Sequence, residues 1–436
     1  MGAVRYGGGA LGGDGVSGAG AAAKAGMVAG GGRLMALAAV SFSSGLFASP
    51  VLFGLFCWPF LVVWVLWASR RPAQAGRMAR LGFGLSLLAL LGCSSGMTWG
   101  QALCLAMEAC VPVLLFSLWT GPEPAQEKAS FREGMEAYLP FFVTGCVFMG
   151  LLLRPPLAAL FFDGAGTVLL AWWDGRATRR ALPAWEMVRL RLSGVILAGL
   201  GLAVMPGGDV FSSHETAMQV GQVLALTGLC MMAGLGSAVS SRAELVLLDV
   251  GLRFVPLFLM TLLAMTPFTH LLMVIAGLLA MASLLLARSG VFPLLPWLTG
   301  LGLLAAGTGQ MLCLLMLYVA ALLAAALRLG CNGFLPSGQT VLPGGLALLP
   351  VQMVLPVVMV VLVVLAPLLD WWALAGLLLC MMLGLWQLKL ETMPQSLLMV
   401  WQRGGPLMRG LLCLLGLLAL LAVAFLASPV LKGYSP

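Results

Sequence analysis

The stretch LAALFFDGAGTVLLAWWDGRATRRALPAWEMVRLRLSGVILAGLGLAVMPG, residues 157–207, shows the pattern that decides the fold. An apolar run leads into a short basic segment, and a second apolar run follows it. An α-helix needs about 20 mainly apolar residues to cross a bilayer, and both runs approach that length. The stretch therefore predicts two membrane helices joined by a basic loop.

The same composition continues along the whole chain. Of its 436 residues, 61% are hydrophobic and only 9% are charged, whereas soluble domains carry about 25% charged residues. The formal net charge of +8 comes from Lys and Arg in short loops between apolar runs, where such residues set the orientation of membrane helices. The composition predicts an all-α, polytopic membrane protein in contact with lipids, and it argues against nucleic-acid binding.

Two regions follow from the distribution of apolar runs. Residues 1–33 are rich in Gly and Ala without helical periodicity, which predicts a disordered tail, and residues 34–436 form a single polytopic transmembrane domain. The predicted spans, about fourteen in number, are 34–68, 81–95, 98–119, 138–153, 157–173, 192–206, 216–239, 245–265, 268–287, 291–306, 308–328, 345–368, 371–388 and 407–427. The first becomes two helices if Pro50 divides it.

The loop charges give an independent test of this order of spans. If the spans alternate in direction and the tail residues Arg5, Lys24 and Arg33 are set aside, one side holds only Arg154 and Lys432. The other side collects Arg70, Arg71, Arg77, Arg80, Lys128, Arg132, Arg176, Arg179, Arg180, Arg189, Arg191, Arg242, Arg288, Arg328, Lys389, Arg403 and Arg409. Positively charged loops stay in the cytoplasm, so the larger set is expected inside and the C-terminus outside, in a bacterial inner membrane.

Four charges fall within or near the predicted spans, and they are the candidate functional residues. Asp163 lies in the fifth span and must find a partner, bind water or be protonated, because a bare charge in the bilayer is unfavourable. Glu108 lies in the third span. Asp249 and Arg253 lie in the eighth at i, i+4 spacing, so they share one helix face and can pair. Each can serve a proton path or a purely structural contact.

Helix-breaking residues mark a second feature of the spans. Pro256 in the eighth span, and Pro350 and Pro356 near the start of the twelfth, remove backbone donors, while Gly234 and Gly236 loosen the end of the seventh. Broken helices often line cavities in transporters, and proline kinks also serve packing. These residues therefore mark positions where a helix can break, and they are only a weak indication of a transport cavity.

The sequence offers little material for a metal or redox centre. Almost all ten cysteines lie in apolar runs without a CxxC motif, and His214 and His270 lack a neighbouring His, Cys or carboxylate at ligand spacing. We expect no cofactor, no metal site and no catalytic site in this chain.

The stretch from residue 157 to 207 resembles the fifth and sixth helices of the antiporter-like subunits of respiratory complex I, membrane-bound hydrogenases and multisubunit cation/proton antiporters. The stretch LLMVIAGLLAMASLLLARSGVFPLLPWLTGLGLLAAGTG, residues 271–309, is similar to the ninth and tenth helices of that family. The resemblance covers about residues 98–390. It implies fourteen helices with two inverted five-helix repeats, proton translocation, and partner subunits in a larger complex. It also places Asp163 at, or within one residue of, the family's fifth-helix glutamate.

The basic residues of that family are not matched. Where the family has lysines in its seventh and twelfth helices, this chain offers Gln219, Gln222 and Gln352, and Arg253 takes the place of the basic residue in the eighth. Arg keeps its proton far more firmly than Lys, so Arg253 is expected to bias a carboxylate rather than relay a proton.

Two hypotheses therefore stay open. In the first, the chain is an antiporter-like subunit in which Asp163, with Glu108, Asp249 and Arg253, takes part in proton or cation translocation, or a structural descendant that has lost transport. In the second, it is a stand-alone secondary transporter or a carrier of a small or lipid-linked substrate. A membrane enzyme is a third possibility. The acidic loop, residues 120–137, alternates glutamates with Lys128 and Arg132, which is typical of a solvated face rather than of a catalytic cluster.

Overall fold

The computed structural model describes most of the chain between residues 54 and 387. The described residues are 54–92, 99–118, 131–153, 155–178, 181–205, 215–235, 242–263, 267–286, 294–332 and 344–387. The chain separates into two units, Met1–Pro50 and Val51–Pro436, and all described residues belong to the second. The predicted tail (1–33), the possible division at Pro50 and the last predicted span (407–427) lie outside them.

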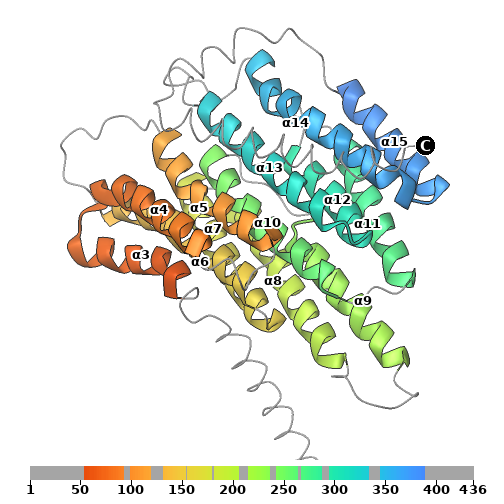
Figure 1. Ribbon diagram of the computed structural model, residues 1–436, viewed down its shortest axis with the longest axis horizontal. Coiled ribbons are helices and arrows are strands. Elements are labelled where there is room, and N and C mark those ends of the chain that lie inside the picture. Colours follow the sequence, from red (N-terminus) through yellow and green to blue (C-terminus); the bar gives the residue numbers. More distant parts are fainter. Residues whose placement is uncertain are drawn as a thin grey trace, which may run out of the picture. The chain divides into compact units, whose positions relative to one another are not determined.

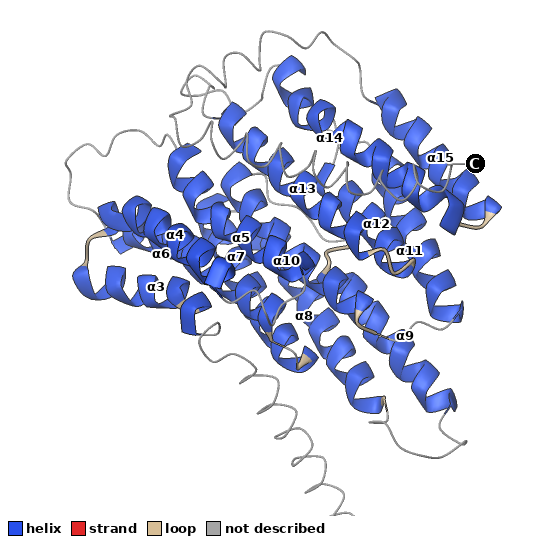
Figure 2. Cartoon of the chain, in the orientation of Figure 1, coloured by secondary structure: helices blue, strands red, loops and turns tan. Residues whose placement is uncertain are grey.

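The described residues are almost entirely helical, and no strand occurs among them (Figure 2). This confirms the predicted all-α class. The α-helices are α3 (Trp58–Ser69), α4 (Ala75–Gly92), α5 (Trp99–Leu118), α6 (Phe131–Leu152), α7 (Pro156–Thr178), α8 (Ala181–Val204), α9 (Glu215–Met232), α10 (Ala243–Thr261), α11 (Pro267–Leu286), α12 (Leu294–Gly307), α13 (Met311–Asn332), α14 (Gly344–Leu365) and α15 (Trp371–Gln387). Short 3-10 turns, η1 (Pro72–Gln74) and η3 (Ala366–Leu368), precede α4 and follow α14.

Among the described residues, three stretches are long and apolar enough to cross a membrane by length and composition, namely Pro156–Arg176, Ala184–Val204 and Met311–Gly330. Several other helices carry shorter apolar stretches. Large apolar side chains also point outward from the bundle, among them Trp64, Leu88, Leu91 and Ile196. Outward apolar surface of this kind is compatible with a lipid environment.

The largest difference from the predicted spans is the start of α8. The helix begins at Ala181, whereas hydropathy placed the start of the span at residue 192. The intervening residues include Glu186, Arg189 and Arg191, whose charges lower hydropathy but not helix propensity. Residues assigned to a basic loop thus belong to the first half of a helix.

The expected proline breaks are wrong for the described helices. Pro256 lies inside α10, and Pro350 and Pro356 lie inside α14, yet both helices continue through these residues. Neighbouring helices can accommodate a proline in an apolar bundle without interruption. The expected glycine effect is confirmed at Gly234, where φ is +84° just beyond the end of α9. Gly236 lies outside the described residues.

Glycines bring α8 and α9 into backbone contact. A Cβ added at Gly201 would lie 2.2 Å from Ala225 N, and one added at Gly228 would lie 2.2 Å from Ala198 N. No side chain fits between the helices at these points, as is typical of small-residue helix pairs. The packing fixes the position of α8, and with it Arg191.

Helix α10 lies at the centre of the described bundle (Figure 1). It packs against α5, α6, α7, α9, α12 and α13. Every residue from Leu245 to Met260 is buried. Polar side chains on α10 therefore face other helices rather than the surroundings, and they require partners there.

Candidate functional site

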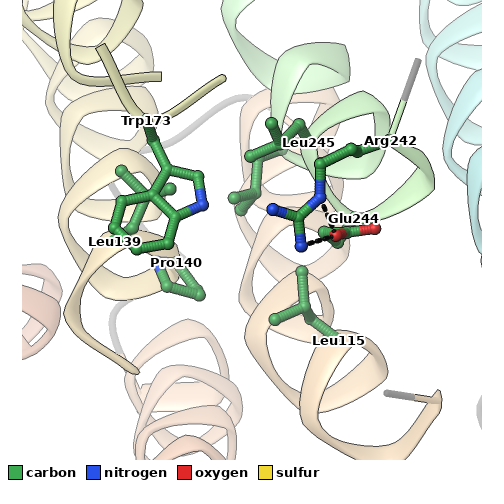
Figure 3. A pocket seen from close by; sticks show the side chains of 8 residues that line it. Leu115, Leu139, Pro140, Trp173, Arg242, Glu244 and Leu245 are labelled. Atoms are coloured by element: carbon green, nitrogen blue, oxygen red, sulfur yellow. Dashed lines mark hydrogen bonds and ion pairs between the residues drawn. The ribbon is translucent and has the colours of Figure 1, made fainter. Parts of the chain in front are cut away.

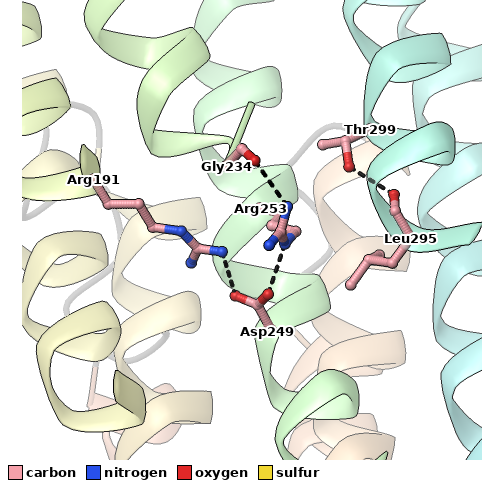
Figure 4. Close-up of polar contacts among 6 residues, drawn as sticks. All are labelled: Arg191, Gly234, Asp249, Arg253, Leu295 and Thr299. Atoms are coloured by element: carbon pink, nitrogen blue, oxygen red, sulfur yellow. Dashed lines mark hydrogen bonds and ion pairs between the residues drawn. The ribbon is translucent and has the colours of Figure 1, made fainter. Parts of the chain in front are cut away.

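The first feature of the site is the predicted pair on α10. Arg253 Nε donates a hydrogen bond of 2.6 Å to Asp249 Oδ2, across one helical turn. Arg253 Nη1 also donates to the carbonyl oxygen of Gly234, at 3.2 Å (Figure 4). The i, i+4 pairing predicted from the sequence is confirmed. The positive φ at Gly234 turns the chain just beyond α9, so its carbonyl group becomes available to the guanidinium.

Arg191 from α8 completes this arrangement from the opposite side. Its Nη2 lies 2.7 Å from Asp249 Oδ1, and both side chains are almost fully buried, with 1% and 2% exposed. Figure 4 shows the Asp249 carboxylate between the guanidinium groups of Arg191 and Arg253. The sequence analysis placed Arg191 in a cytoplasmic loop, and that assignment is wrong. At about 1.5 Å per residue, Arg191 lies about 15 Å along α8.

Asp163 interacts electrostatically with two of these three residues. It is on α7, is 1% exposed, and has Arg191 and Asp249 as electrostatic neighbours. Its Oδ1 makes no hydrogen bond to any residue that the structure describes. We call Asp163, Arg191, Asp249 and Arg253 the charge centre. Its two acids and two bases balance when all four are ionised, so its burial does not leave a net charge.

A second polar centre lies on another side of α10. Tyr318 from α13 donates a hydrogen bond of 2.5 Å to Glu108 Oε2 from α5, and both residues are buried. The carboxyl group of Glu108 lies against Gly251, where an added Cβ would come within 2.8 Å of Oε2. Gly251 sits between Asp249 and Arg253 in sequence, so α10 contacts both centres. We call Glu108 and Tyr318 the carboxyl–phenol centre.

Several buried polar atoms retain unused hydrogen-bonding capacity. Within the described ranges no hydrogen-bond partner is found for Glu108 Oε1, Thr144 Oγ1, Thr167 Oγ1, or Nε and Nη1 of Arg191. Thr167 lies one turn after Asp163 on α7. Buried polar groups without partners are rare, and they concentrate at strained or functional places. The two centres and the two buried threonines are therefore able to accept and donate further hydrogen bonds.

The structure brings three of the four candidate residues together and separates the fourth. Asp163, Asp249 and Arg253 belong to the charge centre, while Glu108 belongs to the carboxyl–phenol centre. Gln222 is buried on α9 and Gln219 is exposed; the side chain of Gln352 lies outside the described residues. In the described part of the chain, no three His, Cys, Asp or Glu side chains form a metal-binding group.

Sequence reasoning missed two members of these centres. Arg191 was hidden by the low hydropathy around it, although a helix drawn from Ala181 would have placed it mid-helix. Tyr318 stands in an apolar run and pairs across 210 residues, a distance over which local patterns carry no information.

Comparison with known proteins gives no match: no family model, no curated protein and no solved structure shows significant similarity to this chain.

Proposed function

We propose that this chain is a polytopic integral membrane protein of about fourteen transmembrane helices that moves protons, or cations, through the charge centre. We further propose that it acts as an antiporter-like subunit of a larger respiratory or hydrogenase-type complex. The observation that carries the proposal is the Asp163 carboxyl group, buried beside the Arg191–Asp249–Arg253 arrangement with one oxygen unpartnered among the described residues. Ionisable groups inside membrane helices are functional candidates by default.

The depth of these residues supports the proposal. Arg191 lies about 15 Å from the start of α8 at about 1.5 Å per residue, which is about half of a 30 Å hydrocarbon core. Asp163 lies about 10 Å from the start of α7 by the same rise. Charges at this depth are expensive unless they pair or meet water, so their retention in an apolar bundle requires either a structural or a transport role.

The proposed mechanism assigns different tasks to the acids and the bases. Asp163 accepts a proton from water on one side, which forms a carboxyl O–H bond, and releases it to the other side. Arg191 and Arg253 keep their protons throughout. When Asp163 is ionised, its carboxylate and that of Asp249 both attract the positive charge of Arg191. When Asp163 is protonated, the Asp249 carboxylate alone compensates the charge of Arg191. The two states differ in how strongly Arg191 is drawn to each acid, which couples protonation to side-chain position.

A proton-flux assay tests the transport part of the proposal. The purified chain is reconstituted in liposomes containing a pH-sensitive dye, and a pH gradient is imposed. We expect proton flux above that of empty liposomes, and its loss in Asp163→Asn. The matched control is Asp370→Asn, because Asp370 is exposed just before α15. Equal flux from both variants would contradict a relay at Asp163, and unaltered assembly without flux in the native chain would indicate a structural subunit.

A pull-down of the tagged protein in mild detergent, followed by mass spectrometry, tests the subunit part. Co-purification with quinone-reductase, hydrogenase or antiporter subunits is the expected result. Recovery of the chain alone would contradict the subunit assignment and favour the stand-alone carrier.

A further inference from the structure

A pocket lies at the end of the bundle where α5 and α7 finish and α6 and α10 begin. The space within it that can hold water is about 20 Å³, which is room for about one water molecule, and the pocket opens outward. The side chains that line it are Leu115, Leu139, Pro140, Trp173, Arg242, Glu244, Leu245 and Leu248 (Figure 3). These residues come from four different helices, so the pocket is formed by the bundle rather than by one loop.

The rim and the floor of this pocket differ in polarity. Arg242 forms an ion pair with Glu244, and their side chains are 28% and 20% exposed. Figure 3 shows the Arg242 guanidinium group next to Glu244, across the pocket from Trp173. Leu115 and Leu245 in the lining are both buried. A charged rim above an apolar floor is the arrangement expected where water meets a hydrophobic barrier.

The helical register relates the floor to the buried polar groups. Leu245 precedes Asp249 by four residues on α10, and residues at this spacing share one helix face. Pro140 precedes Thr144 by four residues on α6. On α10 and α6 a buried polar group therefore lies one turn deeper than the pocket on the same helix face, and a third lining helix shows the same relation over two turns.

The third of these helices is α5, and it leads to the second centre. Leu115 follows Glu108 by seven residues, which is two turns. The polar groups deeper on these helices are thus Asp249 of the charge centre, Glu108 of the carboxyl–phenol centre, and the buried Thr144. Oε1 of Glu108 and Oγ1 of Thr144 have no hydrogen-bond partner within the described residues.

We propose that this pocket is the aqueous vestibule through which protons reach the two buried centres, and that Leu115 and Leu245 form the apolar barrier at its floor. This inference rests on the proposed function and specifies its route on the side that carries Arg242. The ion pair at the rim holds water near the opening, and the leucines limit passage to occasional water molecules.

Cysteine accessibility tests the vestibule independently of transport. Leu245→Cys and Leu248→Cys place thiols on the pocket, and Leu247→Cys is the matched control, because Leu247 is a fully buried leucine of the same helix outside the pocket lining. A small, charged, membrane-impermeant thiol reagent is added to membrane vesicles of each orientation. We expect labelling of the two pocket variants from one side only, above the background of the native cysteines that all variants share, and no such increase for Leu247→Cys.

Proton flux through the same variants then links the vestibule to transport. Modification of Leu245→Cys is expected to abolish flux, while the reagent leaves flux through Leu247→Cys unchanged. Absence of labelling at both pocket positions in a chain that conducts protons would overturn the vestibule and leave the proposed function standing. Labelling that leaves flux intact would also overturn the route. If the pocket variants are labelled but the unsubstituted protein conducts no protons, the proposed function is refuted, while the pocket is still shown to be accessible to water.

Discussion

The two buried polar centres that α10 contacts are stabilised in different ways. The charge centre surrounds the Asp249 carboxylate with two arginines and places Asp163 beside them. The carboxyl–phenol centre has one acid, Glu108, and a single hydrogen bond from Tyr318. The first is balanced by opposite charges, and the second contains no base among its described contacts.

Because of this difference, the loss of one partner should lower the stability of the protein by different amounts in the two centres. Removing one member of a buried ion cluster leaves charges without compensation, which is far more damaging than the loss of one hydrogen bond. The charge centre should therefore dominate stability, and the carboxyl–phenol centre should tolerate substitution.

The largest effect is expected for Asp249→Asn. The substitution keeps the size of the side chain but leaves Arg191 and Arg253 buried without their shared carboxylate. We expect the free energy of unfolding to fall by about 3–5 kcal/mol, measured by thermal or denaturant unfolding in detergent. Asp370→Asn, at an exposed position, is expected to change it by less than about 0.5 kcal/mol. Equal stability of the two variants would show that Asp249 does not hold the centre together.

Gly251→Ala should have the next largest effect, because the methyl group added to α10 would clash with the carboxyl group of Glu108. The added Cβ would lie 2.8 Å from Glu108 Oε2 and 2.8 Å from Val147 Cγ2. Overpacking of this kind lowers the free energy of unfolding by about 1–3 kcal/mol. The matched control is Gly84→Ala in α4, where nothing lies within 4 Å of the new Cβ.

A double substitution locates the source of that effect. In Gly251→Ala combined with Glu108→Ala, the Glu108 part of the clash is removed, so the added loss caused by Gly251→Ala should shrink. If Gly251→Ala costs the same free energy of unfolding with and without Glu108, the added Cβ clashes with Val147 alone, and Glu108 does not pack closely against α10.

Tyr318→Phe should have a smaller effect. It removes only the phenol oxygen and leaves the ring in contact with Phe254 and Phe258. A single hydrogen bond contributes about 0.5–1.5 kcal/mol, and a loss of that size is expected in the same unfolding assay. A loss as large as that of Asp249→Asn would contradict the contrast between the two centres.

Glu108→Gln should have the smallest effect. The amide oxygen of Gln can accept the hydrogen bond from Tyr318 in place of the carboxyl oxygen. A change of less than about 1 kcal/mol in the free energy of unfolding is expected. A larger loss would mean that the charge of Glu108, and not its role as an acceptor, stabilises the centre.

Much of the helix order could be predicted from the sequence, because apolar runs and turn residues are local signals. The pairing of Asp249 with Arg253 was also accessible, since it depends on helical spacing alone. The start of α8 was not, because hydropathy follows charge while helix formation does not. The partnership of Arg191 with Asp249 depends on how α8 and α10 are arranged, and that arrangement arises from packing between distant segments.

The prolines also show that local sequence signals do not determine how helices behave in the packed bundle. Pro256 and Pro356 are strong local signals for a break, yet α10 and α14 continue through them. Support from neighbouring helices overrides the local preference. Residues whose role depends on helix packing, Arg191 and Tyr318 above all, are the part of the site that required the structure.

The most direct test of the central claim is an infrared difference spectrum of the reconstituted protein across a pH jump. If the buried carboxyl group of Asp163 takes up and releases a proton, a carboxylic-acid carbonyl band appears on acidification and is missing in Asp163→Asn. The Glu108→Gln variant, with its centre otherwise intact, should retain that band. Retention of the band in Asp163→Asn would contradict the claim that Asp163 is the group that carries the proton.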